Sequence, residues 1–351
     1  MTDPLSTGAV GPLASQTVWF GVALSDLWFG VVFAFLAIFL FLDGWDFGVG
    51  AIFALRGRTA RNATESERRR CEREREQCLA AIGPFWDGNE VWLVVFGGGL
   101  FAAFPAVYAA LFSRHYLLLF GVLAALVLRG MAPEFYEQRE DRRWRTWWGR
   151  AFAAGSVGAP FLLGVFAGNW LLGVSGVAPA SLGIGLAVVA LNVAAGAAFL
   201  RLKTTGPLAE AMPDYGVRAT AAYLALVSVA LVLLALRPAM RDALLSPAPI
   251  ALVAGSVLLA GGYVVAARRG YPYVTLGAAG GLTGALVSLV AVLLYPVVEP
   301  GTGLTVEEAI IGAPAVELLT AGAALLIPLV LTYFGVLYSA FSGPIDPEES
   351  Y

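Results

Sequence analysis

Apolar residues recur along this chain in long runs, separated by short segments rich in charge, proline and glycine. A helix needs about 20 apolar residues to cross a hydrocarbon core about 30 Å thick. Nine runs are long enough, and they predict transmembrane helices near residues 27–52, 82–112, 115–134, 151–173, 181–200, 217–236, 248–267, 273–297 and 314–340. We therefore expect residues 1–351 to form one all-α, polytopic membrane domain with nine transmembrane helices.

Composition supports this prediction, because hydrophobic residues make up 59% of the chain and charged residues only 13%. Ordinary soluble domains average roughly 45 to 50% and 25%. The net charge of −3 is spread over loops of opposite sign, so no nucleic-acid partner is expected. Residues 1–26 show no basic start and no obvious cleavage site, and we expect them to form an external or interfacial N-terminal segment.

The basic residues predict the orientation, because the cytoplasmic side of a membrane protein collects lysine and arginine. Segment 53–78 holds eight arginines and segment 135–150 holds five. With the N-terminus outside, 18 of the 22 basic residues fall in cytoplasmic loops. We therefore expect a cytoplasmic C-terminus and a charged cytoplasmic loop at 53–78, which is helical because Glu and Arg recur at i, i+3 and i+4.

Candidate metal and haem ligands are scarce. Cys71 and Cys78 lie seven residues apart in the charged loop, about 10 Å along a helix, which is beyond disulfide reach. The single histidine, His115, is expected at the outer end of the third span as an interfacial polar residue. Because a membrane cytochrome needs axial ligands such as His or Met inside its spans, this chain is expected to ligate no metal or haem itself.

Six ionisable residues lie in or at the ends of the first three predicted spans, where each costs about 2.5 to 3.5 kcal/mol to place in a membrane. They are Asp43, Asp46, Asp87, Glu90, Arg129 and Glu134. Asp43 and Asp46 lie three residues apart and so share a helix face, and Asp87 and Glu90 repeat that spacing. The orientation places all six at similar depth, so we expect one polar cluster on the cytoplasmic side.

This cluster has two interpretations. One arginine pairs with at most one or two of the five carboxylates, so the others must be hydrated, protonated, or paired with another chain. Any of these arrangements suits a proton path that enters from the cytoplasm. Alternatively, the charged residues only anchor and cross-link helix ends, and the residues alone do not decide between the two.

Small and aromatic residues predict packing and membrane depth. Close helix approach is expected at Gly44, Gly48, Gly50 and the run 97–99. An interfacial aromatic belt is expected to include Trp86, Trp92, Trp147 and Trp148.

Several stretches resemble subunit II of the cytochrome bd-type quinol oxidases, including the cyanide-insensitive branch. They are LDGWDFGVG (42–50), IGPFWDGNEVWLVVFGGGLFAAFPAVYAALFS (82–113), LRGMAPEF (128–135) and AGNWLLGV (167–174). The carboxyl half resembles the family mainly through its span pattern and IPLVLTYFGVLY (327–338). The resemblance implies a fold of two four-helix bundles plus one extra helix, in the bacterial cytoplasmic (inner) membrane, paired with a similarly folded subunit I.

The resemblance also implies the chemistry. Subunit I carries two b-type haems, haem d and the quinol site, and the complex oxidises quinol and reduces oxygen to water with protons from the cytoplasm. The positions of Asp43, Asp46, Asp87 and Arg129 match a hydrophilic path toward those haems, and that of Trp92 matches the entrance of an oxygen route. Some members bind a structural quinone, which Trp86 would contact. Membrane lipid is a further partner, and whether a small single-span subunit joins stays open.

The sequence departs from the family pattern in two places. Pro133 stands where members commonly have an apolar aromatic residue, and it is expected to bend or end the third span near Glu134. The external connection between the sixth and seventh spans is short, at about 11 residues, so little external decoration is expected there.

Two other functions remain open. A secondary transporter would use broken helices near mid-membrane and inverted repeats, whereas the acids here lie off-centre and no repeat is visible. A purely structural assembly subunit would lose complex yield, but not rate per assembled haem, when its acids are neutralised. The oxidase interpretation instead predicts that Asp87→Asn lowers turnover with the haem content intact.

Overall fold

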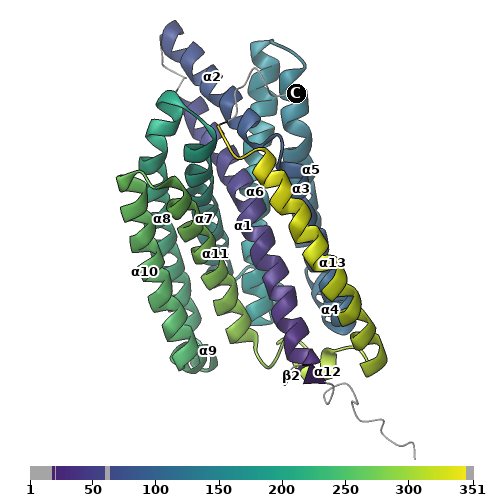
Figure 1. The fold of residues 1–351 in the computed structure, drawn as a ribbon. Coiled ribbons are helices and arrows are strands. Elements are labelled where there is room, and N and C mark those ends of the chain that lie inside the picture. The colour runs from purple at the N-terminus through teal and green to yellow at the C-terminus, as the bar shows by residue number, and fades with distance from the viewer. Residues whose placement is uncertain (1–17, 20, 60–63, 345–351) are drawn as a thin grey trace, which may run out of the picture.

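The computed structural model describes residues 18–344 except 20 and 60–63, and it is a bundle of long helices (Figure 1). The helices are α1 (Leu24–Thr59), α2 (Glu65–Ile82), α3 (Trp86–Ala103), α4 (Pro105–Arg114), α5 (Tyr116–Glu137), α6 (Arg142–Leu172), α7 (Pro179–Lys203), α8 (Gly206–Ala235), α9 (Pro238–Leu244), α10 (Pro247–Arg269), α11 (Pro272–Leu294), α12 (Val306–Ala309) and α13 (Ala313–Ala340). The strands β1 (Val18–Trp19) and β2 (Val22–Ala23) pair antiparallel ahead of α1. The rest of the expected external segment, 1–17 and 20, lies outside the described residues.

Eight of the described helices are long and apolar enough to cross a membrane. They are α1, α5, α6, α7, α8, α10, α11 and α13. The prediction of an all-helical membrane protein is therefore confirmed, while the count of nine transmembrane helices stays a prediction.

The second predicted span, 82–112, differs from expectation because it is not one helix. Ile82 still belongs to α2, and the apolar stretch is divided into α3 and α4. The division falls at Phe104, whose backbone leaves the helical region (φ −131°, ψ 62°), immediately before Pro105. Proline has no N–H to continue the helical hydrogen bonds, but it is well suited to begin a new helix.

Two groups of helices pack around a central pair, α1 and α7. Helix α1 packs against α3, α6 and α7, and α7 in turn packs against α8 and α11. Helices α5 and α6 pack together on one side, and α10 packs against α8 and α11 on the other. Helix α13 runs along the outside of the bundle (Figure 1). The ends of α1, α3 and α5 are thereby held in one neighbourhood, which matters for the site below.

The crossing of α1 and α7 depends on glycine. A Cβ at Gly48 would lie 1.8 Å from the carbonyl oxygen of Asn192, and a Cβ at Gly196 would lie 2.5 Å from the backbone of Gly48. The predicted close approach is thus confirmed for α1. It is wrong for Gly97 and Gly98, because a Cβ added at either would meet no other described part of the chain within 4 Å.

We expect Gly48→Ala to destabilise the folded protein by about 1 to 3 kcal/mol, as overpacking of a tight contact does. The measurement is the thermal unfolding midpoint of the solubilised protein. Gly98→Ala is the matched control, because it adds the same methyl group to a helix with open space beside it. Equal unfolding midpoints for the two variants would contradict this account of the crossing.

The charged segment 53–78 is largely helical, as predicted. Helix α1 continues to Thr59 and α2 begins at Glu65. Thr64 and Glu67 form a capping box at the start of α2, in which the Thr64 N–H donates to the Glu67 carboxylate at 2.8 Å. These hydrogen bonds lower the pKa of Glu67 below its ordinary value. Cys71 and Cys78 are both free thiols.

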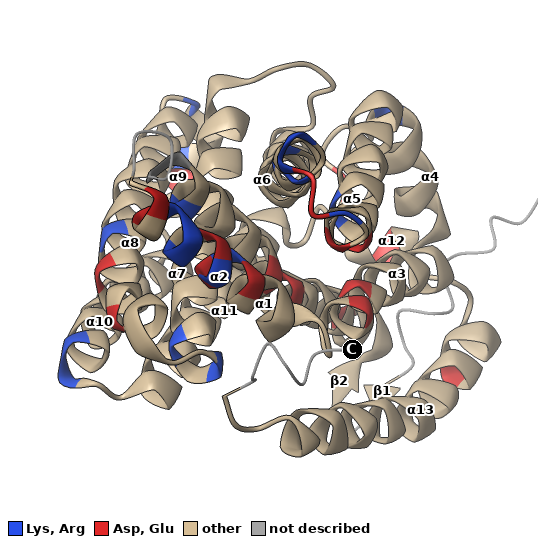
Figure 2. Ribbon diagram, turned by 90° about the horizontal axis from the view of Figure 1, so that it is seen from above, with Lys and Arg blue, Asp and Glu red and all other residues tan. Residues whose placement is uncertain are grey.

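Charged residues gather at one end of the bundle. Figure 2 shows Lys, Arg, Asp and Glu along α2 and around the start of α6. The last described residues lie at this same end, whereas β2 and α12 lie at the other (Figure 1). We call the first end the charged end and the second the far end.

Helix α5 continues through Pro133 to Glu137. Pro133 therefore does not end the helix at Glu134, and the alternative, that it bends the helix there, stays a prediction. Proline removes one backbone donor, and the last turn is held by tertiary packing instead, since Tyr136 is buried with its ring 5.7 Å from that of Phe53.

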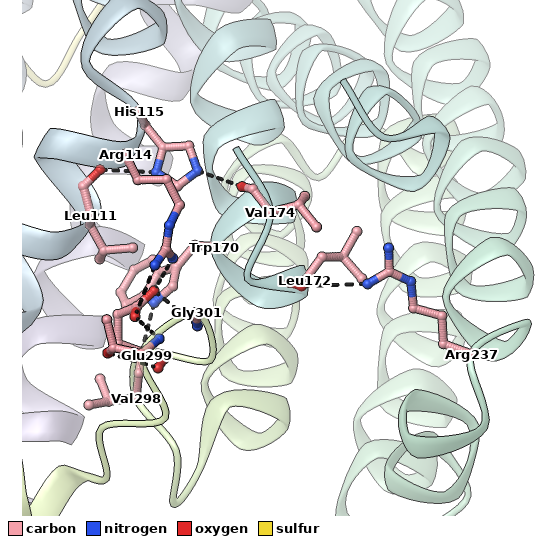
Figure 3. Close-up of polar contacts among 11 residues, drawn as sticks. Leu111, Arg114, His115, Trp170, Leu172, Val174, Arg237, Val298, Glu299 and Gly301 are labelled. Atoms are coloured by element: carbon pink, nitrogen blue, oxygen red, sulfur yellow. Dashed lines mark hydrogen bonds and ion pairs between the residues drawn. The ribbon is translucent and has the colours of Figure 1, made fainter. Parts of the chain in front are cut away.

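At the far end, one buried carboxylate fastens the connection between α11 and α12 to α4. Glu299 is 0% exposed and accepts hydrogen bonds from Arg114 and from the backbone N–H groups of Gly301 (3.2 Å) and Thr302 (2.5 Å) (Figure 3). The Trp170 indole N–H donates to the Val298 carbonyl at 2.7 Å.

Between the sixth and seventh predicted spans, the short connection forms α9.

His115 is buried rather than interfacial, so that expectation is wrong. His115 is 3% exposed, and it caps the C-terminal end of α4. Its two nitrogens lie 3.0 Å from the carbonyl oxygens of Leu111 and Val174 (Figure 3). A neutral imidazole carries one N–H and so donates to one of these two carbonyls. That hydrogen bond offsets part of the cost of burying a polar group.

We expect the ion pair between Glu299 and Arg114 to make the stability of the fold depend on pH. Burial raises the pKa of Glu299, but hydrogen bonds from Arg114 and Thr302 outweigh it and hold the pKa below the ordinary value of 4.5. A carboxylate with a depressed folded pKa stabilises the fold above its unfolded pKa, and this contribution is lost as the pH falls through the folded pKa. The unfolding midpoint should therefore drop in acid for the native protein.

Glu299→Gln should have a lower unfolding midpoint at neutral pH and a smaller further drop in acid. Glu307→Gln is the control, because Glu307 lies in the same region and is exposed. If Glu299→Gln loses as much stability in acid as the native protein does, another group is responsible.

Candidate functional site

A buried arginine gathers three carboxylates from two other helices. Arg129, on α5, is 1% exposed. Its Nη2 lies 2.7 Å from Asp43 Oδ1 and 3.5 Å from Asp46 Oδ2, both on α1. Its Nη1 donates to Glu90 Oε2 on α3 at 3.0 Å. These four residues form the Arg129 cluster.

The sequence places these side chains by simple helix geometry. Asp43 and Asp46 lie three residues apart and so point to the same side of α1. A Cβ at Gly155 of α6 would lie 2.6 Å from the Arg129 backbone nitrogen. Only glycine therefore lets α6 pack this closely against the turn of α5 that carries Arg129. The Arg129 guanidinium also lies 4.8 Å from the Phe47 ring centroid and 5.8 Å from that of Trp86, within range of cation–π attraction.

Two polar residues that the sequence analysis did not select complete the network. Asn89 donates from Nδ2 to Asp46 Oδ2 at 2.8 Å and to the Leu42 carbonyl at 3.2 Å. The Tyr338 hydroxyl, on α13, hydrogen-bonds the Asn89 side-chain oxygen. A signal for Asn89 was present, because it is a buried amide between two acids in FWDGNEVW, whereas nothing local marks Tyr338.

The cluster holds more carboxylate than one guanidinium can neutralise. Asp43 and Asp46 are both 0% exposed. Among the described residues, Asp43 Oδ2 and Asp46 Oδ1 have no hydrogen-bond partner. A buried, ionised and unpaired carboxylate is costly, so these oxygens favour a proton or a water molecule. The arrangement is chemically suited to take up and release protons.

The structure does not bring all six predicted residues together. Asp87 and Glu134 are exposed, so the expectation of a single cluster is wrong for these two. Glu134 follows Arg129 by five residues, which turns it about 140° around the helix and away from the cluster. Asp87 lies in the first turn of α3, one turn before Glu90.

Glu134 instead lines a pocket of about 350 Å³ at the charged end, together with Glu137, Trp86 and the last described residues. Because the Trp86 ring also lies against the Arg129 guanidinium, the pocket and the Arg129 cluster are separated by little more than this ring. The pocket therefore lies beside the Arg129 cluster, on the other side of the Trp86 ring.

Trp92 is a core residue, so its assignment to an interfacial belt is wrong. It is 2% exposed and packs against Phe35 and Phe334 at ring-centroid distances of 6.1 and 5.5 Å. Trp86 is half-buried. Trp147 is 62% exposed, in keeping with a belt residue, while Trp148 stacks on Phe135 at 4.4 Å.

The described residues contain no group of three or more His, Cys, Asp or Glu side chains arranged to hold a metal ion. In the Arg129 cluster, the three carboxylates face the guanidinium of Arg129, and Asp46 also accepts a hydrogen bond from Asn89.

Comparison with known proteins decides the family. A model of the family described as "Cytochrome bd terminal oxidase subunit II" matches residues 24–341. The chain belongs to this family. The resemblance seen in the sequence is thereby confirmed, and the match reaches well into the carboxyl half.

Two curated relatives of the chain come from Escherichia coli and Bacillus subtilis. "Cytochrome bd-I ubiquinol oxidase subunit 2" of Escherichia coli (strain K12) is 34% identical over 223 residues, covering 59% of this chain and 54% of that protein. "Cytochrome bd ubiquinol oxidase subunit 2" of Bacillus subtilis (strain 168) is 41% identical over 143 residues, covering 41% of this chain and 39% of that protein. The matched part thus spans about half the length of these relatives, or less.

One solved structure shares the fold. A chain of the bd oxidase from Geobacillus thermodenitrificans superposes with a TM-score of 0.71 at 18% identity, covering 90% of this chain and 98% of that chain. Together with the eight apolar helices and the bacterial relatives, this places the protein as a multi-pass protein of the bacterial inner membrane.

Proposed function

We propose that this chain is the haem-free subunit II of a cytochrome bd-type quinol:oxygen oxidoreductase. Its partner is subunit I, which would carry two b-type haems, haem d and the quinol site. Membership of the subunit II family and the names of the relatives support this proposal. The fold would comprise nine transmembrane helices in two bundles plus one extra helix, with α3 and α4 crossing as a broken span.

The role of the chain within that complex is to conduct protons toward the haems. The observation that carries this proposal is the Arg129 cluster, in which three carboxylates share one buried guanidinium. A purely anchoring role would need fewer acids, because each uncompensated one destabilises the fold. The excess of carboxylate is useful only if protons occupy and leave the cluster.

The proton path begins at the charged end, which is the cytoplasmic side if the arginine-rich connections face the cytoplasm. Glu134, beside the 350 Å³ pocket, and the exposed Asp87 collect protons near the entrance. Glu90 is partly exposed and hydrogen-bonded to Arg129, so it links the entrance to Asp46 and Asp43. Arg129 and Asn89 hold the aspartates in place.

Two tryptophans have secondary roles in this proposal. Trp92 lies among aromatic rings, an apolar setting that suits passage of oxygen better than of ions. Trp86 lines the pocket at the charged end and is the contact for a structural quinone. Membrane lipid would cover the apolar surface that subunit I leaves free, and the presence of a small single-span subunit stays open.

A tagged copy of this chain tests the proposed function. We expect the complex pulled from membranes to show haem b bands and the far-red chlorin band of haem d in a reduced-minus-oxidised spectrum. A haem-free preparation, from cells shown to make subunit I, would contradict the assignment and restore the transporter interpretation.

A further inference from the structure

A second polar feature lies apart from the Arg129 cluster. A pocket of about 660 Å³ opens at the charged end between α1, α2, α5 and α6. The arginines that line it are Arg68, Arg75, Arg142, Arg145 and Arg150. They come from one side of α2 and one side of the first turns of α6, so the two helices form a basic groove.

Arg75 is built into the wall of this pocket. Its guanidinium carbon lies 3.9 Å from the Phe53 ring centroid and 5.3 Å from that of Tyr136. A Cβ at Gly149 would lie 2.2 Å from Arg75 Nη2, so the guanidinium rests directly on the α6 backbone. Its position is therefore fixed by packing, and burial lowers the pKa of Arg75.

Two donors in the pocket wall are buried and unused. Arg75 has no carboxylate within ion-pair distance among the described residues, and its Nε is buried with no hydrogen-bond partner there. Tyr136 is only 2% exposed, and its hydroxyl likewise has no partner in the described part of the chain. Buried donors without partners are rare and usually indicate a ligand or water.

The remaining charges leave the pocket positive. Arg145 is paired with Glu76 at 3.0 Å, and Arg68 with Glu65 at 3.3 Å. Arg75, Arg142 and Arg150 are without an ion pair among the described residues, against the lining acids Glu72 and Glu140. The excess of guanidinium favours an anion.

The level of the pocket relative to the membrane indicates which anion it binds. Trp147 lies between Thr146 and Gly149, which are both in the wall, and it is 62% exposed on α6. Exposed tryptophans of a membrane protein lie at the level of the lipid headgroups. Phosphate matches guanidinium in geometry and accepts several hydrogen bonds at once, and basic pockets between helices at the membrane surface bind anionic headgroups.

We propose that this pocket binds the phosphate group of an anionic phospholipid, with Arg75 and Tyr136 donating to its oxygens. The other arginines of the groove attract the headgroup, and its acyl chains lie along the apolar surface beyond Trp147. This site is separate from the proton path and does not depend on the redox role of the complex.

Lipid retention tests the proposal. The purified complex is reconstituted in phosphatidylcholine nanodiscs that contain cardiolipin and is then returned to detergent. Native mass spectrometry measures how much cardiolipin stays bound to it. The native protein and Arg73→Gln, a change on the exposed side of α2, should retain bound cardiolipin. Arg75→Gln should lower its apparent affinity about tenfold or more, as loss of a charge-assisted hydrogen bond does.

Tyr136→Phe provides a second variant that keeps the packed ring and removes only the hydroxyl, in case Arg75→Gln fails to fold. We expect it to weaken cardiolipin retention by a smaller factor. Equal retention by the native protein and both variants would overturn the proposal. If inorganic phosphate alone raises the unfolding midpoint of the native protein but not of Arg75→Gln, and cardiolipin is not retained, the site takes soluble phosphate and the lipid assignment is wrong.

Discussion

Arg129→Met will prevent the folded complex from accumulating. The substitution keeps a long side chain of similar reach, but it leaves Asp43, Asp46 and Glu90 without their shared cation. Removing one partner of a buried ion pair costs about 3 to 5 kcal/mol, because the other charge stays buried and uncompensated. The measurement is the amount of haem-containing complex recovered from membranes per cell.

The same account predicts a rescue. Combining Arg129→Met with Asp43→Asn, Asp46→Asn and Glu90→Gln removes the stranded charges together with the cation, and replacement of a whole buried ionic group is often neutral for stability. The combined variant should regain most of the yield while staying slow in oxygen reduction. Normal yield from Arg129→Met alone would show that the cluster carries little net negative charge.

Asp46→Asn will lower oxygen reduction per haem about tenfold or more, which corresponds to about 1.4 kcal/mol in the activation free energy. The amide has nearly the shape of the carboxylate, and its oxygen still accepts from Asn89. It cannot take up and release a proton in the same way, so the rate falls while the fold survives. Oxygen consumption divided by the haem d absorbance measures this effect.

Asp87→Asn is the matched control for this prediction. Asp87 is an acid on the neighbouring helix α3, but it is exposed, and water can replace it at the entrance. Its effect on the rate per haem should be clearly smaller than that of Asp46→Asn. If both variants keep the native rate per haem but lose yield, the acids serve assembly and the structural interpretation is correct.

The long helices were predictable because apolar length alone decides which segments can cross a membrane. The break at Phe104 was not, because proline next to an apolar residue is equally compatible with a continued, kinked helix. Likewise, Pro133 lies inside α5, where tertiary packing of the last turn outweighs a local rule. Local signals predict elements better than they predict their ends.

The candidate site was predictable where helical spacing decides it. Asp43 and Asp46 share a face by their separation, and Arg129 was the obvious cation. Tyr338 reaches Asn89 across 249 residues of sequence, so no local pattern could find it. Glu134 was wrongly grouped with the cluster because similar depth does not determine which side of a helix a residue occupies.

The most direct test of the central claim is proton uptake by the complex in liposomes, measured with a pH dye on the side of α2 during a single oxygen pulse. The account predicts that the native complex takes up protons on that side and that Asp43→Asn/Asp46→Asn slows this uptake in parallel with oxygen reduction. Proton uptake at the native rate in this double variant, with its haems present, would contradict a proton path through the Arg129 cluster.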